Sequence, residues 1–152
     1  MKRRRFHQVT FAIAGAYNLA WGAYSALDPQ WLFRFAGMAP LNYPEIFACL
    51  GMVVGVYGFL YWKVAREPER GFAIAAVGLL GKVLGPIGLA QLIWSGVWPV
   101  KSVVLCLTND FIWWVPFALY LWDVKAAAAP PPSATAVTCG SRGVRNGAPA
   151  AP

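Results

Sequence analysis

Long apolar runs separated by short polar segments dominate the first 125 residues of the chain. Four runs are long enough to cross a bilayer, and we place them at residues 6–27, 46–65, 72–94 and 103–122. A hydrocarbon layer of ~30 Å needs about 20 helical residues. Because an unpaired backbone amide in lipid costs several kcal/mol, these runs are expected to be helices. Their short connections predict an all-α fold, an antiparallel four-helix bundle in a membrane.

The composition of the chain agrees with lipid as its solvent. Of the 152 residues, 59% are hydrophobic and 12% are charged, against roughly 45–50% and 25% in soluble domains. A soluble chain of this size leaves about 30% of its unfolded-state surface in water. The interior of a soluble fold of this size could not bury so much apolar surface, which excludes a typical cytosolic enzyme. Eight Trp, six Tyr and nine Phe fit a membrane protein too, since aromatic rings collect at membrane interfaces.

The basic residues, which give a formal net charge of +7, are distributed unequally between the two ends of the expected helices. Arg34 and Lys101 lie at one end. The other end carries Lys2, Arg3, Arg4, Arg5, Lys63, Arg66, Arg70 and Lys125. By the positive-inside rule, both termini are expected in the cytoplasm of a bacterium, with the chain in the inner membrane. The basic groups form no stripe interleaved with exposed aromatics, so a nucleic-acid partner is not expected.

Two segments are expected to lie outside the four spans. In the loop of residues 28–45, Asp28-Pro29 is typical of a helix start and Gly37 of a helix end. We expect a short helix on the outer membrane surface, serving as an anchor or as a lid over a ligand site. Residues 126–152 are rich in Ala, Pro and Gly and are expected to be a disordered tail. The transmembrane domain would then comprise residues 1–125.

Small residues recur on the first three expected spans at spacings of three and four, which keep them on one helical face. The first span carries Gly15, Asn18, Gly22 and Ser25, and the second adds Ala48 and Gly58 to its helix-packing glycines. The glycines expected to pack helices together on the second and third spans are Gly51, Gly55, Gly78, Gly81, Gly85 and Gly88. Small residues let membrane helices approach closely. These faces are therefore expected to meet.

Two ionisable residues, Lys82 and Asp110, fall within the expected spans. Charged residues at bilayer depth are costly, so they usually face the protein interior and find partners. At about 1.5 Å per residue, Asp110, Asn18 and Lys82 lie about 10, 13 and 18 Å from the outer ends of their helices. We therefore predict that Asn18, Lys82, Asn109 and Asp110 form one buried polar cluster, with Lys82 and Asp110 as an ion pair.

Two prolines lie next to this cluster and are expected to kink their helices. Pro86 cannot donate to the carbonyl of Lys82, nor Pro116 to that of Ile112. Each freed carbonyl needs a side chain or a water as its partner. The cluster could fix helix register without any ligand, or it could be a functional site, since buried charges in membranes serve both purposes.

Several motifs resemble a known family. The stretches YNLAWG (17–22), CLGMVVGVYGFLYW (49–62), GLLGKVLGPIG (78–88) and NDFIWWVPF (109–117) resemble small bacterial four-helix membrane proteins of uncharacterised activity, which are similar to the DoxX-like group. The resemblance covers about residues 6–122. It implies a four-helix membrane fold and assigns no reaction.

Cysteine and histidine provide no recognisable reaction centre. Proteins like this are sometimes labelled peroxide reductases, but Cys49 and Cys106 lie within apolar runs, where a reactive thiolate is not expected. With Cys139 they form no CxxC motif and no Cys/His ligand set, so no metal site is expected. His7, at the start of the first span, is interpreted as interfacial, with proton handling as the alternative.

Three classes of function remain open. The first is a binding or assembly module built around the Lys–Asp–Asn cluster, holding quinone, lipid, a second copy or another membrane protein. The second is a small proton-coupled transporter or channel that uses Asp110 and Lys82, although small multidrug transporters use a glutamate where this chain has Asn18. The third is a membrane enzyme, a redox protein or an isomerase. An isomerase would be expected to have paired carboxylates for acid/base work. The lack of a recognisable reaction centre favours the first class.

Overall fold

A computed structural model describes residues 1–128 of the chain, of which 82% are helical, with no strand among them. The helices are α1 (Arg4–Leu27), α2 (Trp31–Ala36), α3 (Pro44–Arg66), α4 (Phe72–Trp94), η1 (Val100–Ser102), α5 (Val103–Cys106), η2 (Leu107–Phe111) and α6 (Ile112–Ala128). The predicted tail lies outside the described residues, except that α6 continues through residues 126–128.

Three helical segments are long and apolar enough to cross a membrane, namely Pro44–Arg66, Phe72–Trp94 and Val100–Ala128. They correspond to three of the four predicted spans. The segment predicted as the first span is helical, as α1, but it is not among the three. The helix as a whole is less apolar than the other three, because it includes polar residues such as His7, Gln8 and Asn18.

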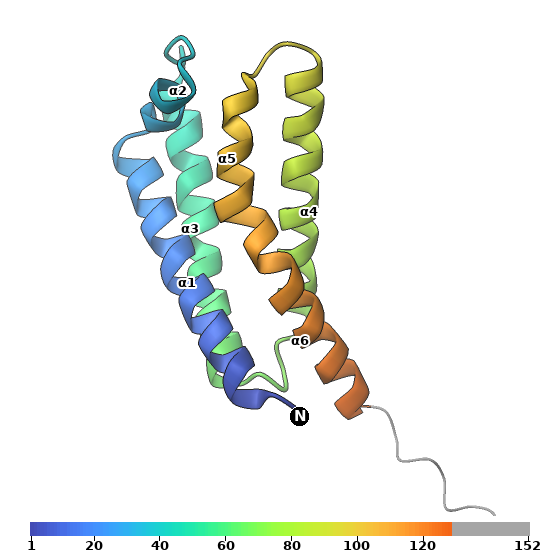
Figure 1. The fold of residues 1–152 in the computed structure, drawn as a ribbon. Helices are drawn as coiled ribbons and strands as arrows, with labels where there is room; N and C mark the ends of the chain where they lie inside the picture. Colours follow the sequence, from blue (N-terminus) through green and yellow to red (C-terminus); the bar gives the residue numbers. More distant parts are fainter. Residues whose placement is uncertain (129–152) are drawn as a thin grey trace, which may run out of the picture.

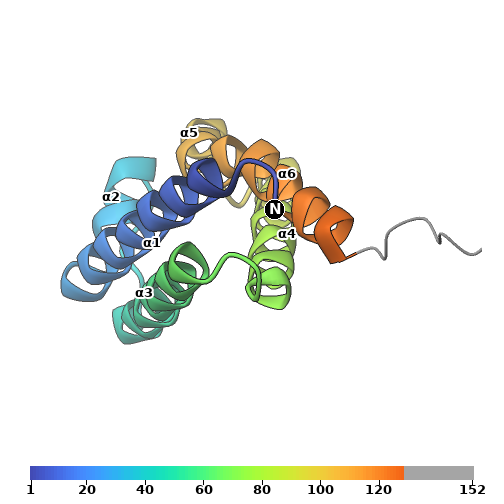
Figure 2. The ribbon, with the colours of Figure 1, turned by 90° about the horizontal axis from the view of Figure 1, so that it is seen from below.

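Helices α1 and α3 lie side by side along their lengths and pack through glycines (Figures 1 and 2). A Cβ atom placed on Gly22 would lie 2.6 Å from the carbonyl oxygen of Gly51 and 2.6 Å from the Cα of Gly55. One placed on Gly58 would lie 2.6 Å from the carbonyl oxygen of Gly15. The small residues of these two helices therefore face one another, and their backbones are in contact.

The glycines of α4 differ in whether another part of the protein packs against them. Gly78 packs against the ring of Tyr61, and a Cβ on Gly85 would lie 3.6 Å from the carboxylate of Asp110. The prediction that Gly81 and Gly88 pack helices together is wrong, because a Cβ at either position would meet no atom within 4 Å. The spacing places both on one face of α4, but no other helix within residues 1–128 packs against them.

An aromatic core joins all four long helices near the first turns of α1. Its buried members are Phe11, Ala14, Tyr61, Val64, Ala75, Trp113, Phe117, Tyr120 and Val124. The ring of Phe11 lies at its centre, 4.6 Å from that of Phe117 and 4.7 Å from that of Tyr120. Centroid separations of this size are typical of favourable aromatic pairs. The core thus fixes the helices relative to one another at the end where the chain begins.

The short helix α2 ends at Gly37, as predicted, where φ is +69°. Its start differs from the prediction, because Gln30 precedes the first helical residue and Asp28 does not cap the helix through its side chain. The Asp28 carboxylate instead accepts hydrogen bonds from the Arg34 guanidinium, which holds the pKa of that carboxyl below its usual range. The indole of Trp31 donates to the Ser25 hydroxyl at 3.0 Å and fastens α2 to the end of α1.

The last membrane-capable segment is not a uniform α-helix. A π-helical turn, η2, separates α5 from α6 and contains Asn109 and Asp110. Figure 1 shows that α5 and α6 are not collinear. The helices run without interruption through Pro86 and through Pro116. The irregular backbone thus contains two residues of the predicted cluster and lies about one turn before Pro116. Such π-helical turns are frequent at functional sites.

Candidate functional site

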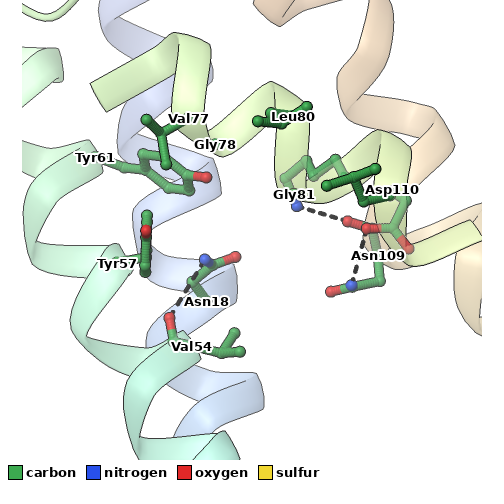
Figure 3. A pocket seen from close by; sticks show the side chains of 12 residues that line it. Asn18, Val54, Tyr57, Tyr61, Val77, Gly78, Leu80, Gly81, Asn109 and Asp110 are labelled. Carbon is green, nitrogen blue, oxygen red and sulfur yellow. Dashed lines mark hydrogen bonds between the residues drawn. The ribbon is translucent and has the colours of Figure 1, made fainter. Parts of the chain in front are cut away.

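The four residues of the predicted cluster line one cavity of about 380 Å³ between the helices (Figure 3). Asn18 comes from α1, Lys82 from α4, and Asn109 and Asp110 from η2. The side chains of Asn18, Lys82 and Asp110 are buried, with exposed fractions of 5%, 6% and 6%. Depth counting along three separate predicted spans therefore selected residues that line one cavity.

The remaining walls of the cavity are mainly apolar and aromatic. They are formed by Val54, Tyr57, Tyr61, Val77, Gly78, Leu80, Gly81 and Leu84. Of these, Val77, Leu80, Gly81 and Leu84 are exposed residues of α4 and form the rim. Lys82 stands near the middle of the 23-residue α4. The cavity thus opens halfway along a membrane-capable helix.

The predicted ion pair between Lys82 and Asp110 is not formed directly. No nitrogen–oxygen distance between the two side chains is within 4.0 Å. The Lys82 ammonium donates to the main-chain carbonyl of Asn109 at 2.7 Å, and the Asn109 amide donates to Asp110 at 3.1 Å. The π-helical turn provides a main-chain acceptor that the lysine reaches in place of the carboxylate. Asn109 therefore bridges the two charged residues.

Asn18 lies apart from this chain of hydrogen bonds. Its amide donates to the carbonyl oxygen of Val54, at 3.4 Å. Figure 3 shows Asn18 beside Tyr57 and Val54, across the cavity from Asn109 and Asp110. The predicted single cluster therefore consists of two polar groups that face each other across a space with apolar walls.

The carbonyl that Pro86 frees has a partner, as the sequence required. The indole nitrogen of Trp114 donates to the carbonyl oxygen of Lys82 at 3.0 Å. The neighbouring Trp113 places its ring centroid 5.7 Å from the Lys82 ammonium, within cation–π range. Two adjacent tryptophans of α6 thus hold the backbone and the side chain of Lys82 in position.

Asp110 and Asn109 also border a second cavity, of about 60 Å³, on the side of α2. Its other lining residues are Trp21, Leu32, Leu105 and Cys106. Cys106 is a free, buried thiol, whereas Cys49 is free and exposed. Asp110 therefore borders two separate cavities.

A second polar cluster, which sequence reasoning did not identify, joins α1 to α6. The buried His7 ring binds Asp123 through Nε2 at 2.8 Å, and Arg3 binds the same carboxylate at 2.7 and 2.9 Å. We call Arg3, His7 and Asp123 the helix-end cluster. His7 Nδ1 has no hydrogen-bond partner among the described residues. Counting depth from the helix ends could have found this cluster, because His7 and Asp123 both lie near the end of the molecule where the chain begins.

No family model, no curated protein and no solved structure matches the chain. Its function is therefore inferred from the cavity and from the residues around it.

Proposed function

We propose that the protein is a multi-pass membrane protein, an antiparallel four-helix bundle in the bacterial inner membrane, that binds a lipid-soluble molecule with a polar head. Both termini would be cytoplasmic, in keeping with the positive-inside rule. Support comes from the three membrane-capable segments, from the unequal distribution of basic residues and from the resemblance to DoxX-like proteins.

The observation that carries this proposal is the cavity whose rim lies halfway along α4. In a bilayer this rim would face acyl chains, so a ligand would enter from the lipid rather than from water. The cavity volume of about 380 Å³ is within the usual range for small-molecule sites, roughly 300–1,000 Å³. Apolar walls with a few buried polar groups fit an amphipathic ligand, such as a quinone or a lipid.

The polar groups offer hydrogen bonds of both kinds to the head of such a ligand. A lysine ammonium has three donors, and Lys82 uses one of them on the Asn109 carbonyl. Asp110 accepts from Asn109 through Oδ1, which leaves Oδ2 able to accept from a ligand hydroxyl. A quinone carbonyl would accept from Lys82. Binding would thus be oriented, with the polar head towards η2.

A matched pair of glycine variants tests the proposal. Gly81 and Gly88 are exposed residues of the same helix, each with open space around its missing Cβ, but only Gly81 lines the cavity. Gly81→Leu should occupy the cavity without disturbing the fold, and Gly88→Leu should leave the cavity open. The measurement is mass spectrometry of molecules extracted from protein purified out of its membrane.

We expect the same co-purified molecule in the wild type and in Gly88→Leu, and its loss in Gly81→Leu. Equal thermal midpoints for the two variants would show that the loss is not caused by unfolding. A wild-type protein without a bound molecule would contradict the binding proposal. So would equal retention by both variants.

The second cavity at Asp110 favours a proton-coupled transporter as the alternative function. An acidic residue that borders two cavities could take up a proton from one and release it to the other. In proteoliposomes loaded with a pH-sensitive dye, transport predicts proton flux that Asp110→Asn abolishes and that Asp28→Asn, on the loop before α2, leaves unchanged. The absence of flux in the wild type would reject this alternative.

A further inference from the structure

A second large groove lies between α1 and α3, close to the start of α1 and the end of α3. Its volume is about 720 Å³, and it shares no lining residue with the cavity around Lys82. The lining residues are Gln8, Val9, Ala12, Trp62, Ala65 and Arg66. The groove is therefore apolar over most of its length and ends in two polar side chains.

The indole of Trp62 forms a fixed wall of this groove. Its nitrogen donates to the carbonyl oxygen of Ala12 at 3.0 Å. A Cβ on Gly15 would lie 2.7 Å from that nitrogen, so the ring can lie across α1 only because residue 15 is a glycine. An amphipathic ring near the end of a membrane-capable helix is typical of the headgroup region.

The groove lies in a region of uncompensated positive charge. Three carboxylates lie at this end of the described chain, and each is bound to an arginine, in the pairs Arg70–Glu67, Arg4–Glu69 and Arg3–Asp123. Five other basic side chains at this end, including Arg66 in the groove, have no ion-pair partner within residues 1–128. They are Lys2, Arg5, Lys63, Arg66 and Lys125.

We propose that this groove binds an anionic phospholipid of the cytoplasmic leaflet. The phosphate would lie against Arg66 and Gln8, and an acyl chain would follow Val9, Ala12 and Ala65 beside the Trp62 ring. Basic pockets between membrane helices on the cytoplasmic side are suited to acidic headgroups. The site is separate from the cavity around Lys82, and it depends on the same membrane location.

A matched pair of arginine variants tests the headgroup contact. Arg66 and Arg70 are exposed arginines four residues apart, but Arg70 is bound to Glu67 at 3.6 Å and lies outside the groove. The full chain in micelles is titrated with phosphatidylglycerol, and native mass spectrometry counts the bound lipids. One basic residue near an acidic headgroup contributes about a fivefold change in affinity, so Arg66→Gln should weaken binding by about that factor. Arg70→Gln should leave the affinity unchanged.

A second pair of variants tests the groove without changing its charge. Ala12→Phe fills the groove, whereas Ala16→Phe places the same side chain one turn further along α1, where it is exposed and outside the groove. Only Ala12→Phe should displace phosphatidylglycerol. Phosphatidylcholine should bind at least fivefold more weakly than phosphatidylglycerol, and inorganic phosphate should not compete with the lipid.

Equal weakening by both arginine variants would mean general attraction to an acidic surface and would overturn the proposal. Three other results would also overturn the proposal. They are displacement of the lipid by inorganic phosphate, equal binding of the two lipids, and unchanged lipid binding in Ala12→Phe. These results are independent of those from the variants Gly81→Leu and Gly88→Leu, because neither glycine lines the groove. A failure here is therefore distinguishable from a failure of the ligand proposal for the cavity.

Discussion

Replacing Gly22 with alanine should weaken the contact between α1 and α3, because the added methyl group has no room. The new Cβ would lie 2.6 Å from the Gly51 carbonyl oxygen and 2.6 Å from the Gly55 Cα. Both neighbours are backbone atoms of α3, so neither can swing aside as a side chain could. The two helices would have to separate locally.

The opposite glycine provides the control, because it should tolerate the same change. A Cβ on Gly55 would lie 3.6 Å from its nearest neighbour, the Cα of Gly22, which is ordinary van der Waals contact. Overpacking a close contact costs about 1–3 kcal/mol, so Gly22→Ala should lower the free energy of unfolding by about that amount. Gly55→Ala should be neutral or slightly stabilising, because alanine favours the helix by roughly 0.5–1 kcal/mol over glycine.

The free energies of unfolding of both variants can be measured in mixed micelles by titration with a denaturing detergent, followed by circular dichroism. Our reasoning predicts a clear difference between two substitutions that add the same methyl group to facing helices. Equal destabilisation by both variants would refute it, because only the interatomic distances distinguish them. A neutral Gly22→Ala would refute the close backbone contact itself.

Two further predictions concern the polar groups. Trp114→Phe removes the donor to the Lys82 carbonyl and should cost about 1–3 kcal/mol of unfolding free energy. In a Pro86→Ala background the restored amide can satisfy that carbonyl, so the same change should cost less in a double-mutant cycle. Asp123→Ala removes the hydrogen-bond partner that the buried His7 ring has within residues 1–128, so it should lower the thermal midpoint more than Glu69→Ala, which breaks an exposed pair. Equal midpoints would show that the helix-end cluster does not hold α1 to α6.

Helix positions and depth along them could be predicted from the sequence, because both follow from apolar length and a constant rise per residue. The same count placed Asn18, Lys82 and Asp110 at depths that differ by about 8 Å, within the reach of a lysine side chain. All three line one cavity. Because proline has no amide donor, Pro86 predicts that the Lys82 carbonyl needs another hydrogen-bond partner. The sequence could not identify Trp114 as that partner, since this depends on how α4 and α6 are rotated about their axes.

The features that could not be predicted from the sequence depend on local irregularity of the backbone and on which helix faces are covered by other helices. A π-helical turn shifts the register of the residues after it, so the contact of Lys82 with the Asn109 carbonyl had no signal in the spacing. Gly81 has the same small-residue spacing as the glycines of α3, but whether a neighbour covers its face is decided by the whole fold. His7 and Asp123 are 116 positions apart, and only the meeting of α1 and α6 makes them partners.

The exposed rim of the cavity makes little contribution to the packing that joins the helices. The aromatic core near the first turns of α1 includes neither Val77, Leu80 nor Leu84. Substitutions at these positions change the shape of the cavity entrance at little cost in folding free energy. At the proposed ligand site, preference could therefore diverge between related chains, or be altered by laboratory selection, while the scaffold stays the same.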